Sequence, residues 1–377
     1  MTTLSRRHVL AMGAIGLMAT GCTQTLPPKP RPTLSPTSAP TTPASWDELA
    51  SAVTGTLLRP GDTGYDAARL VQNPRFDDAR PLGVLTAASA TDVATGLGFA
   101  ASQAVPLALR SGGHSYTGWS SGGAAGTDMP PGLVIDTRGM TDVTVGDDNA
   151  VNIQAGASLA QVYTALGNAG RAIAAGSCAT VGATGLILGG GVGVLSRAWG
   201  LSCDAVTEVE IVTADGRLRK ATATKDPELF WACRGGGGGH LGVVTSLTLQ
   251  TQPAPKVTMF SLSWPFSSAA DVVKAWQSWA PQADPKLWST LKLLAGSDHA
   301  AGPGLYLSGT WIGPKAGLAA QLAPLLTAVG TAPSHNGAST RSYLDAMMSY
   351  AGCTNIPLAQ CTTGDGGRLH RQSFSAT

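Results

Sequence analysis

Glycine is concentrated in three short segments, which limits the folds open to this chain. There are 48 glycines among 377 residues, where an average protein has roughly 7% glycine. The segments are residues 110–116, 176–193 and 234–239, and each adjoins a predicted helix or strand. Because glycine lacks a Cβ atom, backbone N–H groups there can converge on an anion. The pattern predicts a cradle of bare backbone for a phosphate-bearing ligand; the alternative is that these glycines only form flexible loops and tight turns.

The two common phosphate-binding motifs are absent. No glycine precedes Lys-Ser or Lys-Thr, and residues 191–196 lack the third glycine of the dinucleotide fingerprint, which argues against a Rossmann NAD domain. The 25 basic and 23 acidic residues form no long run of either sign, so a nucleic-acid partner is not expected. His299, His335 and His370 have no carboxylate or thiol at metal-ligand spacing, so no metal site is expected.

Hydrophobic periodicity divides the folded part into two α+β regions. The first contains predicted strands 83–86, 105–109, 133–136, 150–154, 206–213 and 243–251, with helices 91–103, capped by Thr91-Asp92, and 158–168. After residues 253–255 the glycine clusters end and tryptophans become frequent. The predicted strands there are 257–264, 288–295 and 305–312, and the predicted helices are 269–279 and 315–329. We therefore predict one domain over residues 77–253 and a second over 254–377.

The first 45 residues do not have the composition of a packed domain. Arg6-Arg7 precedes an apolar stretch, residues 9–20, that is too short for a membrane span. Residues 1–22 are expected to be a twin-arginine export signal; the alternative is an ordinary secretory signal with a chance arginine pair. Cys22 is a candidate lipid-attachment site, and the Pro-, Thr- and Ser-rich residues 23–45 predict an extended linker. The protein is expected to be secreted or attached to the cell envelope.

Two nucleophilic side chains lie inside the glycine clusters. His114 is in the first cluster and Cys178 is in the second. Taken singly, such a histidine is most often a solvated loop residue, and such a cysteine is most often an inert buried thiol. Their occurrence together in two glycine clusters weakens both of these ordinary interpretations.

The clusters as a set resemble the berberine-bridge-enzyme-like branch of the FAD-linked oxidases. The matching motifs are Arg110-Ser-Gly-Gly-His-Ser-Tyr116, Gly176-x-Cys178-x-x-Val181-Gly182, Leu188-Gly-Gly-Gly-Val-Gly193 and Leu229-Phe-Trp-x-x-Arg234 with the glycine run after it. The resemblance runs from about residue 77 to residue 253 and continues more weakly beyond. It implies an α+β fold: a two-part PCMH-type (vanillyl-alcohol-oxidase-like) FAD-binding domain, followed by an incomplete α+β substrate domain whose antiparallel sheet is covered by helices.

The resemblance also implies FAD bound through two covalent bonds. A ring nitrogen of His114 would bond the 8α-methyl group of the flavin, and the sulfur of Cys178 would bond C6. Imidazole and thiolate are both suited to attack an electrophilic ring edge. By the same resemblance, the pyrophosphate would lie on the backbone of Arg110, Ser111, Gly112, Gly113 and Ser115. The ring and ribityl chain would be lined by Val181, Gly182, Gly185, Gly189, Gly190 and Gly193, and the adenosine half would lie near residues 242–244, Val244 included.

The implied reaction removes a hydride from a C–H bond beside a hydroxyl group. The substrate would be a small molecule such as a sugar, oligosaccharide or alcohol. In this family a valine at the position of Val181 goes with oxygen access, so we expect an oxidase that yields H2O2; the alternative is a dehydrogenase with another acceptor. Tyr116 is the candidate for the phenol that faces the substrate as base partner or hydrogen-bond donor; the alternative is a packed structural tyrosine.

The remaining cysteines and the C-terminus lead to further expectations. Cys353 and Cys361 are predicted to form a disulfide in an exported protein, while Cys203 and Cys233 are predicted to be buried free thiols. His240 is predicted to be a surface residue. Members of the family continue beyond the equivalent of residues 371–377 and complete the substrate domain there, commonly with the catalytic base, so the chain is expected to be C-terminally truncated. It is then either a shortened active oxidase or a flavin-binding remnant without turnover; an extracellular ligand-binding module is a third class. A monomer is expected.

Overall fold

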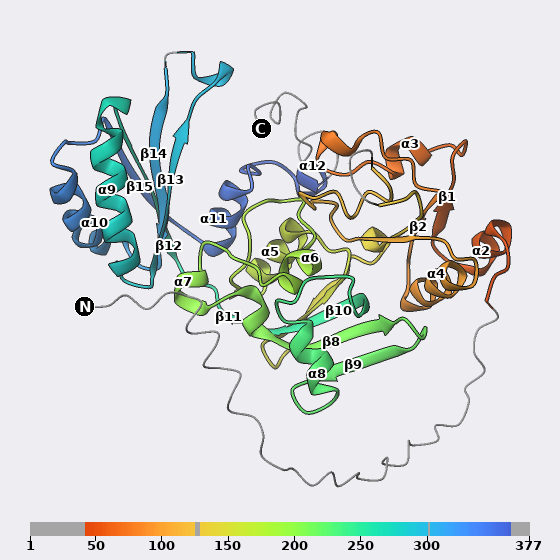
Figure 1. The fold of residues 1–377 in the computed structure, drawn as a ribbon. Coiled ribbons are helices and arrows are strands. Elements are labelled where there is room, and N and C mark those ends of the chain that lie inside the picture. The colour runs from red at the N-terminus through yellow and green to blue at the C-terminus, as the bar shows by residue number, and fades with distance from the viewer. Residues whose placement is uncertain (1–41, 125–128, 301, 363–377) are drawn as a thin grey trace, which may run out of the picture. The chain divides into compact units, whose positions relative to one another are not determined.

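The computed structural model describes residues 42–124, 129–300 and 302–362 (Figure 1). The predicted export signal, Cys22, most of the predicted linker, His370 and residues 371–377 lie outside the described residues. Within the described part, no helix is long and apolar enough to cross a membrane.

The first sheet has four short strands in the order β1-β2-β4-β3. Strands β2 and β3 both run parallel to β4, and β1 is antiparallel to β2. The predictions for β2 and β4 are confirmed at both ends, while β3 starts two residues later than predicted. The bounds are Thr56–Leu58 (β1), Gly83–Thr86 (β2), Leu107–Arg110 (β3) and Leu133–Asp136 (β4). All four residues of β4 are buried, as expected for a parallel strand covered on both faces.

Helices cover this first sheet. They are α2 (Trp46–Ala52), α4 (Ala90–Ser102) and the short α3 (Tyr65–Ala68). The predicted cap of α4 is wrong: the Ser89 side chain accepts from the backbone N–H of Asp92, so α4 starts at Ala90. The Asp92 carboxylate instead accepts backbone N–H groups at the end of β2 and before β1, which sequence periodicity cannot show.

The second sheet is antiparallel, with the order β5-β6-β10-β8-β9. Its strands are Val143–Val145 (β5), Ala150–Gln154 (β6), Val206–Thr213 (β8), Leu218–Thr222 (β9) and Gly242–Gln250 (β10). Helices α5 (Leu159–Asn168), α6 (Ala183–Leu188), α7 (Ser196–Trp199) and α8 (Pro227–Ala232) accompany it, and β7 (Arg171–Ala172) pairs with β11 (Gln252–Pro253). Ser158 and Gln161 form a capping box that starts α5. The predicted β6, β8 and α5 are confirmed, whereas β9 was not predicted.

The third sheet follows residue 256 and has the order β13-β14-β12-β15. Its strands are Val257–Trp264 (β12), Leu287–Leu294 (β13), Gly304–Trp311 (β14) and His335–Arg341 (β15). One face packs against α9 (Ala269–Trp279) and α10 (Lys315–Val329), and Trp264, Trp279 and Trp311 are buried there. These tryptophans therefore belong to a hydrophobic core. The predicted α9 and α10 are confirmed, and β15 was not predicted.

Helix α11 (Tyr343–Tyr350) follows the third sheet in sequence but packs against α5. The Tyr343 hydroxyl donates to the carbonyl of Ile173 (3.0 Å), and its ring meets that of Tyr163 edge-on. The short α12 (Leu358–Thr362) also contacts α5. The end of the described chain is therefore part of the core that surrounds the second sheet.

Six 3-10 turns complete the described elements: Pro74–Phe76, Thr137–Gly139, Ser202–Ala205, Phe266–Ser268, Ala280–Gln282 and Ser297–His299.

Candidate functional site

Two of the glycine segments are in direct backbone contact. The segment after β3, which we call the His114 loop (residues 111–120), lies against the turn that precedes α6. A Cβ atom on Gly112 would overlap the backbone nitrogen of Gly182 and lie 2.8 Å from the carbonyl oxygen of Thr180. A Cβ atom on Gly182 would in turn overlap the Ser111 side chain. Glycine at both positions is what allows the two segments to touch.

This contact brings the loops of the two candidate nucleophiles together. The Nε2 atom of His114 is 2.9 Å from the hydroxyl of Thr180, two residues after Cys178. The Cys178 thiol is exposed. His114 is half-buried, and burial lowers its pKa to about 4, so its imidazole is neutral at pH 7. A neutral imidazole is the nucleophilic form, and this pKa shift depends on burial, which local sequence does not show.

The rest of the second cluster and the third cluster gather around α6. The backbones at Ala175 and Gly193 approach so closely that a Cβ atom on Gly193 would overlap the Ala175 carbonyl. Gly190 has φ +106°, a conformation that favours glycine. The N–H groups of Gly235 and Gly237 both donate to the carbonyl of Leu188 at the end of α6 (3.1 and 2.8 Å). The three segments are thus parts of one structure.

Helix α6 carries glycines that no packing contact requires. Gly185 lies within α6, and Gly189 directly follows its last residue. Both are exposed, and their spacing of four residues places them on the same side of the helix, which we call the open glycine face. A Cβ atom on Gly185 would meet nothing nearer than the Cβ of Ser111, at 4.0 Å. The hydroxyl of the neighbouring Thr184 is buried without a hydrogen-bond partner among the described residues. A side chain could fill this space, and none of the described residues does so.

The residues present fit FAD. The open glycine face offers bare backbone to a flat ring or a sugar-phosphate chain, and the adjoining loops offer an imidazole and a thiol. Bare backbone suits close approach of the cofactor, and either nucleophile could form a covalent bond to it. Val181 is half-buried and its carbonyl accepts from the N–H of Leu159 (2.9 Å). Val244 is buried in β10, opposite Ile211 of β8.

Tyr116 is exposed. Its side chain is 83% accessible, so the alternative of a packed structural tyrosine is wrong. Ser115, its neighbour, shares a hydrogen bond with Thr117 (3.1 Å). The hydroxyl of Ser111 donates to the carbonyl of Ala155 (2.6 Å). Tyr116 is therefore free to meet a ligand, whereas the Ser111 side chain is engaged within the protein.

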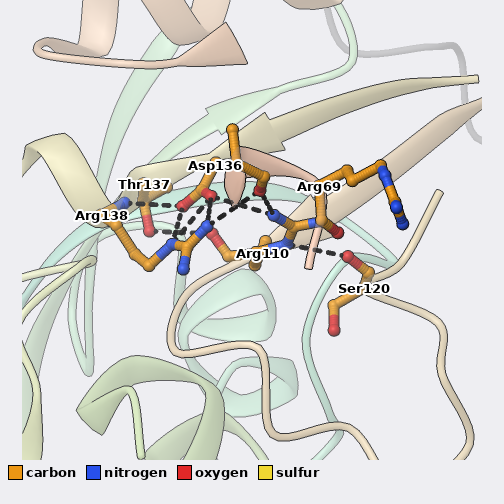
Figure 2. Close-up of polar contacts among 7 residues, drawn as sticks. Arg69, Arg110, Ser120, Asp136, Thr137 and Arg138 are labelled. Carbon is orange, nitrogen blue, oxygen red and sulfur yellow. Dashed lines mark hydrogen bonds and ion pairs between the residues drawn. The ribbon is translucent and has the colours of Figure 1, made fainter. Parts of the chain in front are cut away.

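The Arg110 side chain does not point to the glycine backbone. It is fully buried and pairs with the buried carboxylate of Asp136 (3.3 Å), which also binds Arg138 (2.6 Å). Figure 2 shows this cluster beside the start of the His114 loop. The guanidinium therefore supports the loop from within, and only the backbone of Arg110 is available for the predicted pyrophosphate contact.

One arginine links the FAD-binding region to the third sheet. Arg197, at α7, donates to the carbonyl groups of Ala280 (2.6 Å), Ala283 (2.7 Å) and Leu287 (3.1 Å). The first two carbonyls lie between α9 and β13, and the third belongs to the first residue of β13. Local sequence assigns Arg197 no such role, because its carbonyl partners lie 83 to 90 residues further along the chain.

The predicted disulfide between Cys353 and Cys361 is confirmed, with Cα atoms 5.7 Å apart. It packs in one cluster with Ala160 and Ala179, so it lies against the segment that carries Cys178. Cys203 and Cys233 are buried and free, and His240 is exposed, all as predicted.

Removing this disulfide is expected to destabilise the protein. The closed loop is short, so a chain-entropy estimate for Cys353→Ala/Cys361→Ala is a loss of about 2–3 kcal/mol in free energy of unfolding. Urea denaturation with and without dithiothreitol measures it. The reductant should lower the urea concentration at the unfolding midpoint of the wild type and leave that of the double variant unchanged. An equal shift in both proteins would contradict the prediction.

Sequence reasoning missed three polar residues of the site. Thr180 lies inside the motif that contains Cys178, and a hydroxyl group at this position is a sequence signal for a hydrogen-bond partner of the histidine. Asp136 ends an otherwise apolar strand, which is an unusual place for a carboxylate. Tyr163 donates to the carbonyl of Gly176 from within α5, and nothing in its helical pattern distinguishes it from a core tyrosine.

Comparisons with known proteins point to FAD binding by the same part of the chain. Residues 81–222 match the family model described as FAD binding domain. The FAD-linked oxidoreductase YgaK of Bacillus subtilis is 34% identical over 303 residues, which are 78% of this chain and 63% of that protein. The chain therefore spans less than two thirds of the length of this relative.

Two solved structures have the same fold over most of the chain. The berberine bridge enzyme-like protein 1 of Physcomitrella patens superposes with a TM-score of 0.75 at 28% identity, covering 84% of this chain and 66% of that one. A chitooligosaccharide oxidase superposes with a TM-score of 0.72 at 26% identity, covering 84% and 65%. The predicted fold class is confirmed, and the chain belongs to the berberine-bridge-enzyme-like family of FAD-linked oxidoreductases.

Proposed function

We propose that this chain is the FAD-carrying part of an oxidase in which His114 and Cys178 both bond the flavin covalently. The observation that carries the proposal is the contact between the two loops, in which His114 lies 2.9 Å from the Thr180 hydroxyl beside Cys178. When bound, FAD supplies a two-electron acceptor that takes a hydride and passes the electrons to O2.

The chain's own residues have three tasks in this proposal. The neutral imidazole of His114 and the exposed thiol of Cys178 fix the ring at two points. The open glycine face lets the cofactor approach the backbone of α6. The exposed phenol of Tyr116 is the candidate to exchange a proton with the substrate hydroxyl.

A carbohydrate or another alcohol is the proposed substrate class. One structural relative is named for its oxidation of chitooligosaccharides, and oxidation at a carbon that bears a hydroxyl fits the tasks above. The test is peroxide release by purified protein over a panel of sugars, oligosaccharides and aromatic alcohols. A well-folded flavoprotein that reduces neither O2 nor an artificial acceptor with any of them would contradict the proposal and favour a flavin-binding remnant.

Replacing Val181 with leucine tests oxygen as the acceptor. Family resemblance implies that this side chain lies over the flavin, where a larger group obstructs O2. Val181→Leu is expected to slow reoxidation by O2 at least about tenfold, equivalent to about 1.4 kcal/mol in the barrier, while anaerobic reduction by substrate is unchanged. Stopped-flow absorbance measures both half-reactions. A wild type that reoxidises equally slowly in air and in nitrogen would refute the oxidase assignment and favour a dehydrogenase.

We also propose that the protein is exported in its folded state by the twin-arginine route. A covalent flavin must be attached where FAD is made, and this route carries folded proteins. Replacing Arg6 and Arg7 with lysine is expected to keep the protein inside the cell, as followed by immunoblots of cell fractions. Undiminished export of this variant would contradict the proposal.

A further inference from the structure

The side chain of Arg110 connects the two ends of the His114 loop. Arg110 is the last residue of β3 and directly precedes the loop. Its Nε donates to the carbonyl of Ser120, at the other end of the loop (3.0 Å). Figure 2 shows Arg110 between Ser120 on one side and Asp136 on the other. One side chain therefore closes the loop that presents His114.

Other contacts hold the guanidinium in a fixed position. Its Nη1 donates to the carbonyl of Ala68 (2.6 Å) and its Nη2 to that of Arg69 (3.1 Å), both at the end of α3. Arg110 and Asp136 have no exposed side-chain surface. Burial lowers the pKa of Arg110 to about 10, and the Asp136 carboxylate opposes this change, so the group is charged at neutral pH. A buried cation with this many partners has a single low-energy position.

The loop between these ends is supported close to His114. Gly113 has φ +72°, and its carbonyl accepts from the N–H of Gln72 (3.1 Å). His114 then reaches Thr180 on the neighbouring segment. The imidazole is thus held between Gly113 and Thr180, and the separation of the loop ends is set by Arg110. Without the guanidinium, the Ser120 carbonyl would lose its partner, and the loop could widen.

We propose that Arg110 is a positioning residue for the covalent bond at His114. This rests on the proposed function. The bond replaces one C–H bond of the 8α-methyl group and the imidazole N–H bond with one C–N bond, and the two protons and two electrons released reduce O2 to H2O2. Bond formation needs the reacting atoms at a short, defined separation. The Arg110 guanidinium meets this need through the backbone of the loop, and the side chain itself does not touch the cofactor.

The test compares Arg110→Gln and Arg110→Lys in two backgrounds. In Cys178→Ala protein His114 is the only anchor, and in His114→Ala protein Cys178 is the only anchor. Riboflavin, the precursor of FAD, is supplied to the cells that produce the protein. The measurement is the fraction of flavin that stays with the protein after acid precipitation, as a function of time after this addition. Because misplacement by about 1 Å can cost a hundredfold in rate, attachment through His114 is expected to slow by about tenfold to a hundredfold. Attachment through Cys178 is expected to stay unchanged.

Arg138→Gln is the matched control, because Arg138 binds the same Asp136 carboxylate but does not touch Ser120. It should leave attachment at both anchors unchanged. Arg110→Lys is the variant that is more certain to fold, because lysine keeps the positive charge beside Asp136. Its single amino group cannot replace the hydrogen bonds of Nε and both Nη atoms. If Arg110→Gln does not fold, the lysine variant decides the question. A cooperative thermal unfolding transition shows that the lysine variant is folded.

Three outcomes overturn the inference. Attachment through His114 at the wild-type rate in the lysine variant shows that closure of the loop is not needed. Equal slowing at both anchors shows a general structural effect, and so does equal slowing in Arg138→Gln. If the unmodified chain carries no covalent flavin at all, the proposed function fails instead, and this result is distinguishable because it needs no Arg110 variant.

Discussion

Protein in which both His114 and Cys178 are replaced by alanine is expected to lose all covalently bound flavin, whereas each single variant keeps it through the other residue. The two side chains lie on adjoining loops joined by the bond from His114 to Thr180, yet each bond forms independently because each nucleophile is complete by itself. Flavin fluorescence on a denaturing gel is the measurement, supported by the mass of the intact protein.

Matched controls are available within the chain. Cys203→Ala removes a buried free thiol and His240→Ala removes an exposed imidazole, both outside the two joined loops. Neither change should alter the bound flavin. Fluorescence that survives in the His114→Ala/Cys178→Ala protein would show a third attachment residue, and a wild type without gel fluorescence would refute covalent attachment.

Alanine at Gly112 and alanine at Gly185 are expected to have opposite effects on stability. A Cβ atom on Gly112 would overlap the backbone of Gly182, and backbone cannot move aside as a flexible side chain can. Overpacking of this kind lowers the free energy of unfolding by about 1–3 kcal/mol or more. It would also separate the two loops that carry His114 and Cys178. Gly112→Ala is therefore expected to lower the melting temperature and the flavin content together.

Gly185→Ala serves as the contrasting variant. Its Cβ would meet no atom nearer than 4.0 Å. Replacing glycine inside a helix with alanine raises the free energy of unfolding by about 0.5–1 kcal/mol. Its melting temperature should stay the same or rise. If the open glycine face holds FAD, the ratio of flavin to protein should nevertheless fall, as measured by absorbance at 450 and 280 nm. Equal flavin content in Gly185→Ala and wild type would argue against this face as the cofactor site.

Local sequence patterns predicted most elements whose side chains alternate or repeat clearly. Strands β4, β6, β8 and β12 and helices α9 and α10 have the predicted bounds. Strand β15 was missed because its residues, His335–Arg341, include no large apolar side chain. It is an edge strand that pairs with β12 through its backbone, and backbone pairing has no hydrophobic period.

The sequence by itself determined the residue types of the site: bare glycine backbone, one histidine and one cysteine. These residue types carry their chemistry wherever they stand: glycine lets a ligand approach the backbone, and imidazole and thiol are nucleophiles. Only the tertiary structure decided that the first two glycine segments touch at Gly112 and Gly182, that His114 is half-buried with a pKa of about 4, and that the Arg110 side chain supports the loop from within. Contacts, burial and long-range hydrogen bonds arise between segments far apart in the chain, and they depend on three-dimensional packing that local pattern does not contain.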